Sequence, residues 1–155
     1  MTPGEIDAQV VTQRALWIRE MLEALRELPL AERQVFLQHR NTAAAAESYL
    51  RRALEALFDI GRHILAKKFA HPAAEYKEIV EGLLQRGVLE ASTAALMRKM
   101  AGYRNRMVHF YQEISPEELW EIGSRHLTDI ELVLSTLLQW IKAQPGHSGP
   151  ESTAR

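Results

Sequence analysis

The sequence contains no cysteine among its 155 residues. This excludes a disulfide framework, a thiolate metal site and a thiol nucleophile, and it fits a reducing compartment. No stretch reaches the ~18 uncharged apolar residues typical of a membrane-spanning helix. The opening stretch MTPGEIDAQV has no basic segment followed by an apolar run, so no signal peptide is predicted. We expect a cytoplasmic protein that does not associate with membranes.

An excess of one charge is also missing. The 19 Lys and Arg residues nearly balance the 20 Asp and Glu residues, which leaves a net charge of −1. A nucleic-acid partner would therefore have to bind a local basic patch. Phosphate-binding glycine loops are absent because no predicted strand precedes a glycine. No nucleophile-elbow pattern indicates a serine triad.

Metal-ligand patterns are equally scarce. Di-iron helical bundles use Glu-x-x-His on two helices, and no such pair occurs. Asp59 and His63 lie one turn apart on a predicted helix, but two ligands are too few for a metal site. The sequence therefore predicts no metal ion and no other cofactor.

Runs of β-branched residues are missing, and Ala, Leu, Glu and Arg dominate, which favours helices throughout. We expect an all-α, up-and-down helical bundle in which residues 1–143 form a single domain. Residues 144–155 carry Pro, Gly, Ser and Thr with few apolar residues, so they are predicted to form a disordered tail. The hydrophobic periodicity predicts six helices, over 5–28, 30–39, 42–69, 75–86, 93–109 and 116–143.

Three polar residues are suitable N-caps for predicted helices, namely Asn41, Ser92 and Ser115. Ser115 is followed by Pro116 at the first helical position and Glu118 at the third, which is a strong helix-start signal. The predicted helix over 42–69 carries five cations that we interpret as a solvated face: Arg51, Arg52, Arg62, Lys67 and Lys68.

Residues 96–111, LMRKMAGYRNRMVHFY, carry the functional argument. On an ideal helix with about 100° per residue, one apolar stripe is predicted to face the core. Arg104 lies on the edge of this stripe, and His109 points away from it. The stripe contains Leu96, Met100, Tyr103, Met107 and Phe110.

Arg104 and His109 lie about 140° apart around such a helix, so a straight helix does not bring their side chains together. Three arrangements would do so: a helix that ends near Val108, a kink at Gly102, or a second chain that completes the site. Taken singly, an arginine at a core edge usually pairs with a carboxylate or extends to solvent. A histidine near a helix end usually serves as a cap.

The order arginine, four residues, histidine, one residue, tyrosine resembles the motif of HEPN domains of the HepT toxin type. The flanking sequence MAGYRNRMVHFYQEISPEEL is similar to this family as well. Upstream, YLRRALEALFDIGRHILAKK is similar to the long helix that precedes the family's motif. The resemblance covers about residues 40–140, and it implies a HEPN-like bundle of about five to six helices.

This resemblance implies a metal-independent endoribonuclease toxin. RNA carries a 2′-hydroxyl next to each phosphate, and its deprotonation lets the oxygen attack the phosphorus. His109 is expected to transfer the proton, because histidine titrates near neutral pH. Arg104 is expected to bind the phosphate oxygens. Asn105 is expected to orient the imidazole or donate to a phosphate oxygen, and Arg106 to strengthen the RNA contact.

The resemblance also implies partners: RNA (transfer or messenger RNA), a second copy of the chain in a homodimer, and a nucleotidyltransferase antitoxin. The antitoxin is expected to attach AMP to Tyr111, with Tyr103 as the second candidate. The alternative is a non-catalytic helical subunit of a nucleotidyltransferase, which binds a nucleotide or a partner through the same side chains. In the homodimer the two motifs are expected to meet in one cleft, which Arg98, Lys99, Arg104 and Arg106 would make locally basic.

Overall fold

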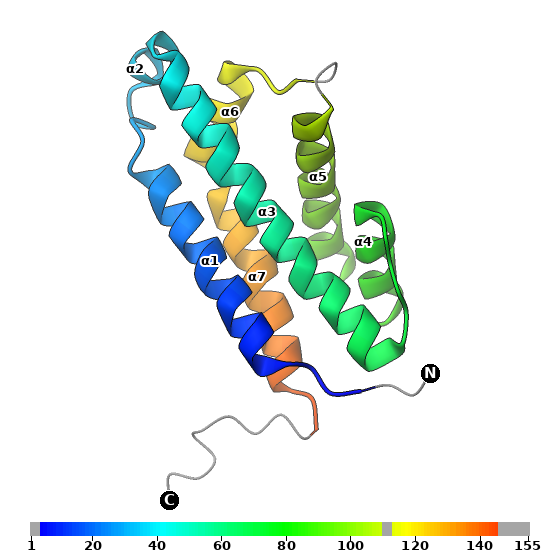
Figure 1. Cartoon of the computed structure of the whole chain (residues 1–155). Helices are drawn as coiled ribbons and strands as arrows, with labels where there is room; N and C mark the ends of the chain where they lie inside the picture. The colour runs from blue at the N-terminus through cyan, green and yellow to red at the C-terminus, as the bar shows by residue number, and fades with distance from the viewer. Residues whose placement is uncertain (1–3, 110–112, 146–155) are drawn as a thin grey trace, which may run out of the picture.

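Residues 4–109 and 113–145 are described by a computed structural model of the chain. Within them the chain forms seven helices and no strand. The long helices α1, α3, α5 and α7 alternate in direction, and α2, α4 and α6 are short (Figure 1). This arrangement confirms the predicted all-α, up-and-down bundle. The helices are α1 (Ala8–Arg26), α2 (Arg33–Gln38), α3 (Arg40–Phe69), α4 (Tyr76–Gln85), α5 (Ala91–Val108), α6 (Pro116–Arg125) and α7 (Leu127–Lys142).

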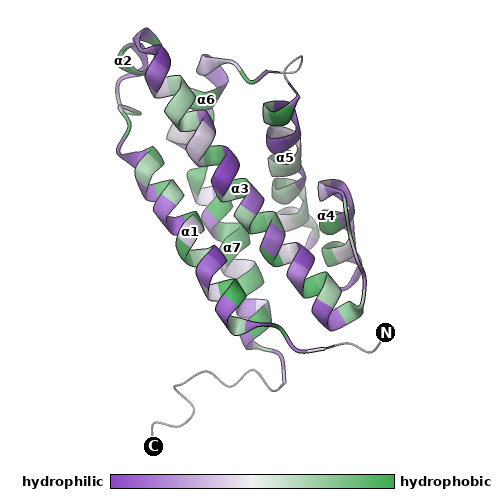
Figure 2. Ribbon diagram, in the orientation of Figure 1, coloured by the Kyte–Doolittle hydropathy of each residue, from purple (hydrophilic) through white to green (hydrophobic). Residues whose placement is uncertain are grey.

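Helix α3 is the centre of the bundle. It has 30 residues and contacts each of the other six helices. Apolar side chains recur every three or four residues along it, and Leu50, Leu54, Leu57 and Ile64 are fully buried. Figure 2 shows the matching alternation of hydrophobic and hydrophilic segments along α3. This amphipathic pattern is what holds α3 against neighbours on several sides.

Several helix ends follow from local chemistry. The Oδ1 atom of Asp7 accepts hydrogen bonds from the backbone N–H groups of the residues two and three positions later, and it caps α1. Ala70 ends α3 in the left-handed region, with φ 49°, and Pro72 follows soon after it. The Ser115 hydroxyl accepts a hydrogen bond from the Glu118 N–H at 3.2 Å. This last contact confirms the predicted start of α6.

Two predicted caps are wrong. The N-cap of α3 is His39 rather than Asn41. The N-cap of α5 is Glu90 rather than Ser92, because the Glu90 N–H donates to the Thr93 Oγ1 at 3.1 Å and starts the helix earlier. The side chain that fixes this helix start is therefore a threonine inside the helix, paired with the backbone of Glu90.

The single helix predicted over 116–143 is also wrong, because the chain breaks at His126. That residue has φ −119° and ψ 5°, and it separates α6 from α7. Just before it, the Ser124 hydroxyl donates to the Trp120 carbonyl at 2.7 Å, a contact that often bends helices. Gly123 adds a residue with low helix propensity. This break accounts for seven helices in place of the predicted five to six.

Helix α4 packs closely on α3, and this contact positions the site. A Cβ atom at Gly61 would lie only 2.9 Å from the Ile79 side chain on α4, so glycine allows the close approach. At the start of α4 the Tyr76 ring stacks on Phe58 of α3, with ring centroids 4.3 Å apart and planes 15° apart. Helix α5 packs against α4 on the far side from α1.

None of the helices in the described ranges has the combined length and apolarity needed to cross a membrane. Helix α7 ends at Lys142 and the described chain at Pro145. Residues 146–155, most of the tail that was predicted to be disordered, lie outside the described residues.

Candidate active site

A cleft of about 480 Å³ lies between α3, the start of α4 and the end of α5. It brings together the predicted site residues Arg104, Asn105 and His109. Other helices contribute Arg62 on α3, and Glu75, Tyr76 and Lys77 at the start of α4. The cleft therefore joins the predicted motif with residues that lie 27 or more positions away in the sequence.

His109 reaches the cleft because α5 ends just before it. The helix runs without interruption through Gly102 to Val108. His109 then adopts an extended conformation, with φ −105° and ψ 101°. Of the three arrangements that the sequence left open, this is the first, in which the helix ends near Val108. One chain is thus sufficient to place an arginine and a histidine in the same cleft.

The buried face of α5 differs from the predicted stripe. Met97, Met100 and Ala101 are buried, whereas Tyr103 and Met107 are only partly buried. The cause is that α5 packs against α4 and α3 as well as α7, so its core face is rotated toward Met97. Arg104 lies seven residues after Met97, on the same side of the helix. Phe110, the last residue of the predicted stripe, lies outside the described residues.

Arg104 sits on an aromatic platform. Its Cζ atom lies 4.5 Å from the centroid of the Tyr76 ring, whose other face stacks on Phe58. The Arg104 Nε is buried without a hydrogen-bond partner. No Asp or Glu of residues 4–109 and 113–145 lies within 4 Å of this guanidinium. The expected pairing of a core-edge arginine with a carboxylate is therefore not seen, and its charge is open to an anionic ligand.

The ring beneath Arg104 is a neutral phenol at physiological pH. Burial raises the pKa of Tyr76, and the nearby Arg104 lowers it by less. Two guanidiniums lie over this ring, because the Arg62 Cζ is also 5.9 Å from its centroid. Such contacts are electrostatic attractions between a cation and the negative face of a ring. This contact holds Arg104 without neutralising its charge, whereas Arg62 also pairs with Asp59.

Arg62 and Lys77 are cleft residues that the sequence analysis missed. The Arg62 side chain is 39% exposed, and its guanidinium also donates to the carbonyl oxygens of Ala73 and Ala74 at 3.3 and 3.4 Å. It also pairs with Asp59 at 3.0 Å, and thereby fixes the segment that leads into α4. No signal within the sequence links Arg62 or Lys77 to the motif, because only the packing of three helices brings them together.

The other cations expected in the cleft lie elsewhere. Arg106 makes two hydrogen bonds to the Glu118 carboxylate, at 2.7 and 2.8 Å. Arg98 pairs with Glu81 at 2.6 Å. Lys99 lines a small hollow between α5, α6 and α7. None of these three lines the cleft of the single chain, where Arg62 and Lys77 lie beside Arg104. Their expected place in a cleft between two copies of the chain stays a prediction.

Of the two tyrosines expected as candidates for AMP attachment, one lies within the described residues. Tyr111 lies outside the described residues. Tyr103 lines the hollow between α5, α6 and α7, away from the cleft. Burial raises the pKa of Tyr103, and the Glu118 carboxylate raises it further. Both effects disfavour the ionised, nucleophilic form of its hydroxyl.

The two residues considered as a metal pair are engaged in other contacts. Asp59 pairs with Arg14 at 3.3 Å and with Arg62 at 3.0 Å. The His63 Nε2 accepts a hydrogen bond from the Asp7 N–H at 2.9 Å. In the part of the chain that the structure describes, no three His, Asp or Glu side chains form a group that could hold a metal ion.

Known proteins resemble this chain in sequence and in fold. A family model described as "Ribonuclease HepT-like" matches residues 18–137. A curated relative, the mRNA nuclease HepT of Shewanella oneidensis, is 27% identical over 88 residues. This match spans 57% of the chain and 66% of the relative, just under two thirds of the relative's length.

Two solved structures share the fold. The tri-AMPylated Shewanella oneidensis HEPN toxin in complex with its MNT antitoxin superposes with a TM-score of 0.78 at 20% identity. That match covers 86% of this chain and 99% of the toxin. A toxin–antitoxin structure with AMP-PNP superposes with a TM-score of 0.76 at 20% identity, covering 84% of this chain and 99% of the other.

Proposed function

Because the chain belongs to the HepT-like ribonuclease family, we propose that it is a metal-independent endoribonuclease toxin. The observation that carries the proposal is the meeting of Arg104 and His109 in one cleft, where no described carboxylate pairs with the arginine. Messenger RNA is the favoured substrate, because the curated relative is named an mRNA nuclease. Transfer RNA is the alternative.

The proposed reaction is a displacement at phosphorus with two proton transfers. One proton leaves the attacking 2′-hydroxyl, and one is taken up by the leaving 5′-oxygen. His109 accepts the proton of the 2′-hydroxyl, and the oxygen forms a bond to phosphorus as the bond to the 5′-oxygen breaks. That leaving oxygen takes up a proton. The products are a 2′,3′-cyclic phosphate and a 5′-hydroxyl. Arg104 binds the non-bridging oxygens, where negative charge accumulates in the transition state.

Three neighbours support these two residues. Lys77 adds positive charge to the cleft, and Asn105 lies one helical turn before His109, from where its amide can orient the imidazole. For Arg106 we propose a structural role in place of the expected contact with RNA. Its two hydrogen bonds to Glu118 tie the last turn of α5 to α6, and thereby hold the helix end that places His109.

We also propose a homodimer. The single-chain cleft already holds an arginine and a histidine, so the angle between them no longer requires a second chain. The reaction, however, needs an acid for the leaving oxygen as well as a base. Among the described cleft residues, His109 is the one histidine. A second copy of the chain, placed with its own His109 facing this cleft, would supply the acid.

The partner that we propose is a nucleotidyltransferase antitoxin that attaches AMP to Tyr111. One of the solved relatives is described as tri-AMPylated and in complex with MNT antitoxin. Tyr111 lies two residues after His109, so an adenylate there would bring bulk and negative charge close to the cleft. The partial burial and acidic surroundings of Tyr103 make it the weaker candidate.

An RNA cleavage assay in the presence of a chelator tests the nuclease proposal. His109→Ala is expected to lower the rate by about 10²- to 10⁴-fold, and Arg104→Ala by about 10²- to 10³-fold. Two controls keep the wild-type rate, His39→Ala and Arg19→Ala, because both side chains are exposed and outside the cleft. Binding of RNA or nucleotide without cleavage by wild-type protein, unchanged in His109→Ala, would favour the non-catalytic module.

A further inference from the structure

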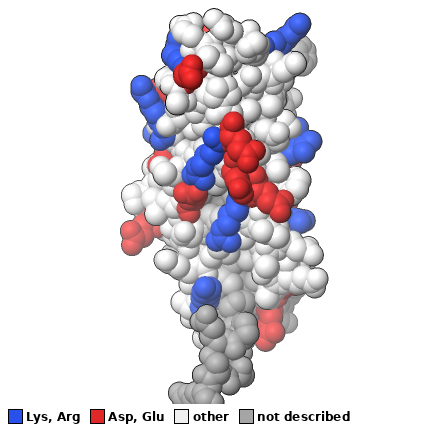
Figure 3. Space-filling model, turned by 90° about the vertical axis from the view of Figure 1, so that its left-hand side faces the viewer, with Lys and Arg blue, Asp and Glu red and all other residues white. Residues whose placement is uncertain are grey.

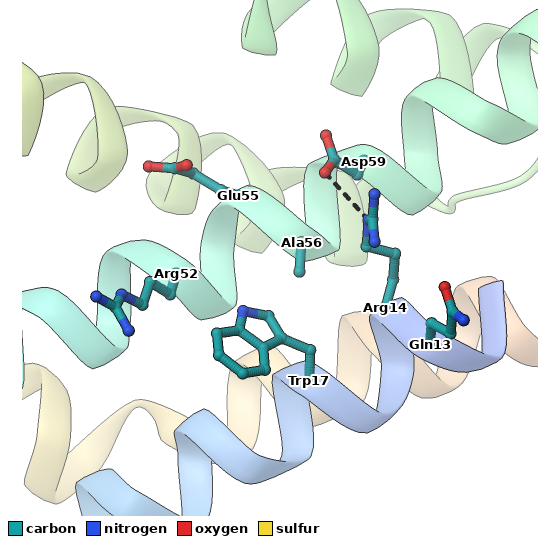
Figure 4. A pocket seen from close by; sticks show the side chains of 7 residues that line it. All are labelled: Gln13, Arg14, Trp17, Arg52, Glu55, Ala56 and Asp59. Atoms are coloured by element: carbon teal, nitrogen blue, oxygen red, sulfur yellow. Dashed lines mark ion pairs between the residues drawn. The ribbon is translucent and has the colours of Figure 1, made fainter. Parts of the chain in front are cut away.

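A second pocket lies on the other side of α3 from the active-site cleft. It has a volume of about 420 Å³ and is formed by α1 and α3. Figure 4 shows the Trp17 ring on α1 facing α3, between the side chains of Arg52 and Arg14. The Trp17 residue is 39% exposed. Such a surface offers a flat aromatic face with cations on two sides.

Trp17 differs from the other two tryptophans. The Trp120 indole N–H donates to the Leu30 carbonyl at 2.9 Å, and the Trp140 ring lies 5.8 Å from the Phe69 ring. Trp17 has neither a hydrogen bond nor a ring contact with the rest of the described chain. Exposing a large apolar ring without a partner is unfavourable in water, so its place beside a pocket points to a ligand.

One of the two cations beside the ring, Arg52, has no carboxylate partner among the described residues. Both carboxylates of the pocket are already paired: Glu55 with Arg51 at 3.1 Å, and Asp59 with Arg14 at 3.3 Å and Arg62 at 3.0 Å. Arg52 is exposed, and no described Asp or Glu lies within 4 Å of it. Figure 3 shows that positive and negative side chains are mixed on the side of the molecule formed by α1 and α2. Arg52 is therefore the cation of this pocket that is available to an anionic ligand.

The two pockets are linked through a single ion pair. Asp59 lines the α1–α3 pocket and binds Arg62, which lines the active-site cleft. The Tyr76 ring, the floor of the cleft, carries Arg62 on its face. The linings of the two pockets therefore meet at this ion pair.

We propose that the α1–α3 pocket is a second binding site for the RNA substrate, in which a nucleobase stacks on Trp17 and Arg52 binds the adjacent phosphate. This inference rests on the proposed function, because it extends the path of the same strand. Aromatic stacking with a flanking arginine is how proteins bind single-stranded nucleic acid without reading its sequence. The site would hold nucleotides that flank the cut and set the length of RNA that binds well.

Binding is measured with a fluorescent 12-nucleotide RNA in which every 2′-hydroxyl is methylated, since it cannot be cut by 2′-oxygen attack. Trp17→Ala is expected to weaken binding by about tenfold. Trp17→Phe, which keeps an aromatic face, is expected to retain most of the affinity. Arg52→Gln is expected to reduce the slope of log affinity against log salt concentration by about 0.7, as for one lost phosphate contact. Quenching of the wild-type tryptophan fluorescence on binding, absent in Trp17→Phe, reports the stacking directly.

Matched controls are available on the same helix. Leu16→Ala removes a neighbouring exposed apolar residue, and Arg19→Gln removes an exposed arginine. Both side chains lie on the groove between α1 and α7 rather than on the proposed site. Wild-type affinity is expected in both controls. Equal losses in Trp17→Ala and Leu16→Ala, or a change of oligomeric state in Trp17→Ala, would overturn the proposal and mark this face as a protein interface.

Cleavable RNA separates this inference from the nuclease proposal. For a dinucleotide, which fills the cleft alone, Trp17→Ala is expected to match the wild-type kcat/KM. For a 12-nucleotide substrate its KM is expected to rise about tenfold with kcat unchanged. Wild-type cleavage that Trp17→Ala does not alter at either length would overturn the second site and leave the nuclease intact. Binding that depends on Trp17 without cleavage would overturn the nuclease alone, and absence of RNA binding would overturn both.

Discussion

Replacing Tyr76 with leucine tests whether the aromatic platform positions Arg104. The change removes the ring that lies 4.5 Å from the Arg104 Cζ but keeps an apolar side chain at this position. A cation–π contact at a partly desolvated site contributes about 1–2 kcal/mol. If the transition state needs the guanidinium in this position, kcat/KM for RNA cleavage falls about 5- to 30-fold, since 1.4 kcal/mol corresponds to tenfold. Most of the loss is expected in kcat, because phosphate charge accumulates during the reaction.

The same substitution also removes the stacking with Phe58, which lowers the free energy of unfolding by about 1–3 kcal/mol. Circular dichroism and urea unfolding must therefore accompany the cleavage assay. Tyr76→Phe keeps the ring and is expected to stay within about twofold of the wild-type rate. In an Arg104→Ala background, Tyr76→Leu is expected to have little further effect, because the two residues act through one contact. A folded Tyr76→Leu protein with wild-type kcat, or with the same loss in both backgrounds, would refute the platform.

Two further predictions concern stability. Gly61→Ala is expected to lower the free energy of unfolding by about 1–2 kcal/mol, because its Cβ would lie 2.9 Å from the fully buried Ile79 side chain. Gly102→Ala, where nothing lies within 4 Å, is expected to raise it by up to ~1 kcal/mol; urea unfolding that ranks the two the other way would contradict the packing. Burial lowers the pKa of His63 below its ordinary value of 6.5. Below pH 6.5 the unfolded chain therefore binds more protons at this histidine than the folded chain does. The contribution of His63 to stability is constant above that pH and falls as the pH decreases. The loss of stability between pH 7.5 and 5.5 is expected to be smaller in His63→Ala, which cannot accept the hydrogen bond from the Asp7 N–H; an equal loss in both proteins would contradict this assignment.

The sequence predicted most of the fold because local signals and tertiary packing agree along most of the chain. Apolar spacing marked α3 correctly, and Ser115 marked the start of α6. The predicted helix boundaries are wrong where a weak local preference determines whether a helix continues. The break at His126 depends on Ser124 and Gly123 together, and neither residue is a strong helix breaker alone. Hydrophobic periodicity continues across the break, and therefore predicted one helix.

The candidate site was predicted in part, and the missing part has a physical cause. Arg104, Asn105 and His109 are close in sequence, so a motif can indicate them. Arg62, Tyr76 and Lys77 come from α3 and α4, and only packing at Gly61 brings them to the end of α5. Conversely, Arg98 and Arg106 sit beside the motif in sequence but are held by Glu81 and Glu118. Charge counted along the sequence therefore did not indicate which basic residues line the cleft of the single chain.

The packing around Arg104 affects how the motif can act. A guanidinium without a carboxylate partner is costly to bury unless another group stabilises its charge. In this chain the Tyr76 ring does so, and it leaves the charge of Arg104 available to a phosphate. In the proposed mechanism the motif supplies the reacting groups, while residues of α3 and α4 determine whether the arginine stays unpaired. A chain with the same arginine and histidine but with a carboxylate in place of the aromatic ring would form an internal ion pair, and its arginine would compete poorly for RNA.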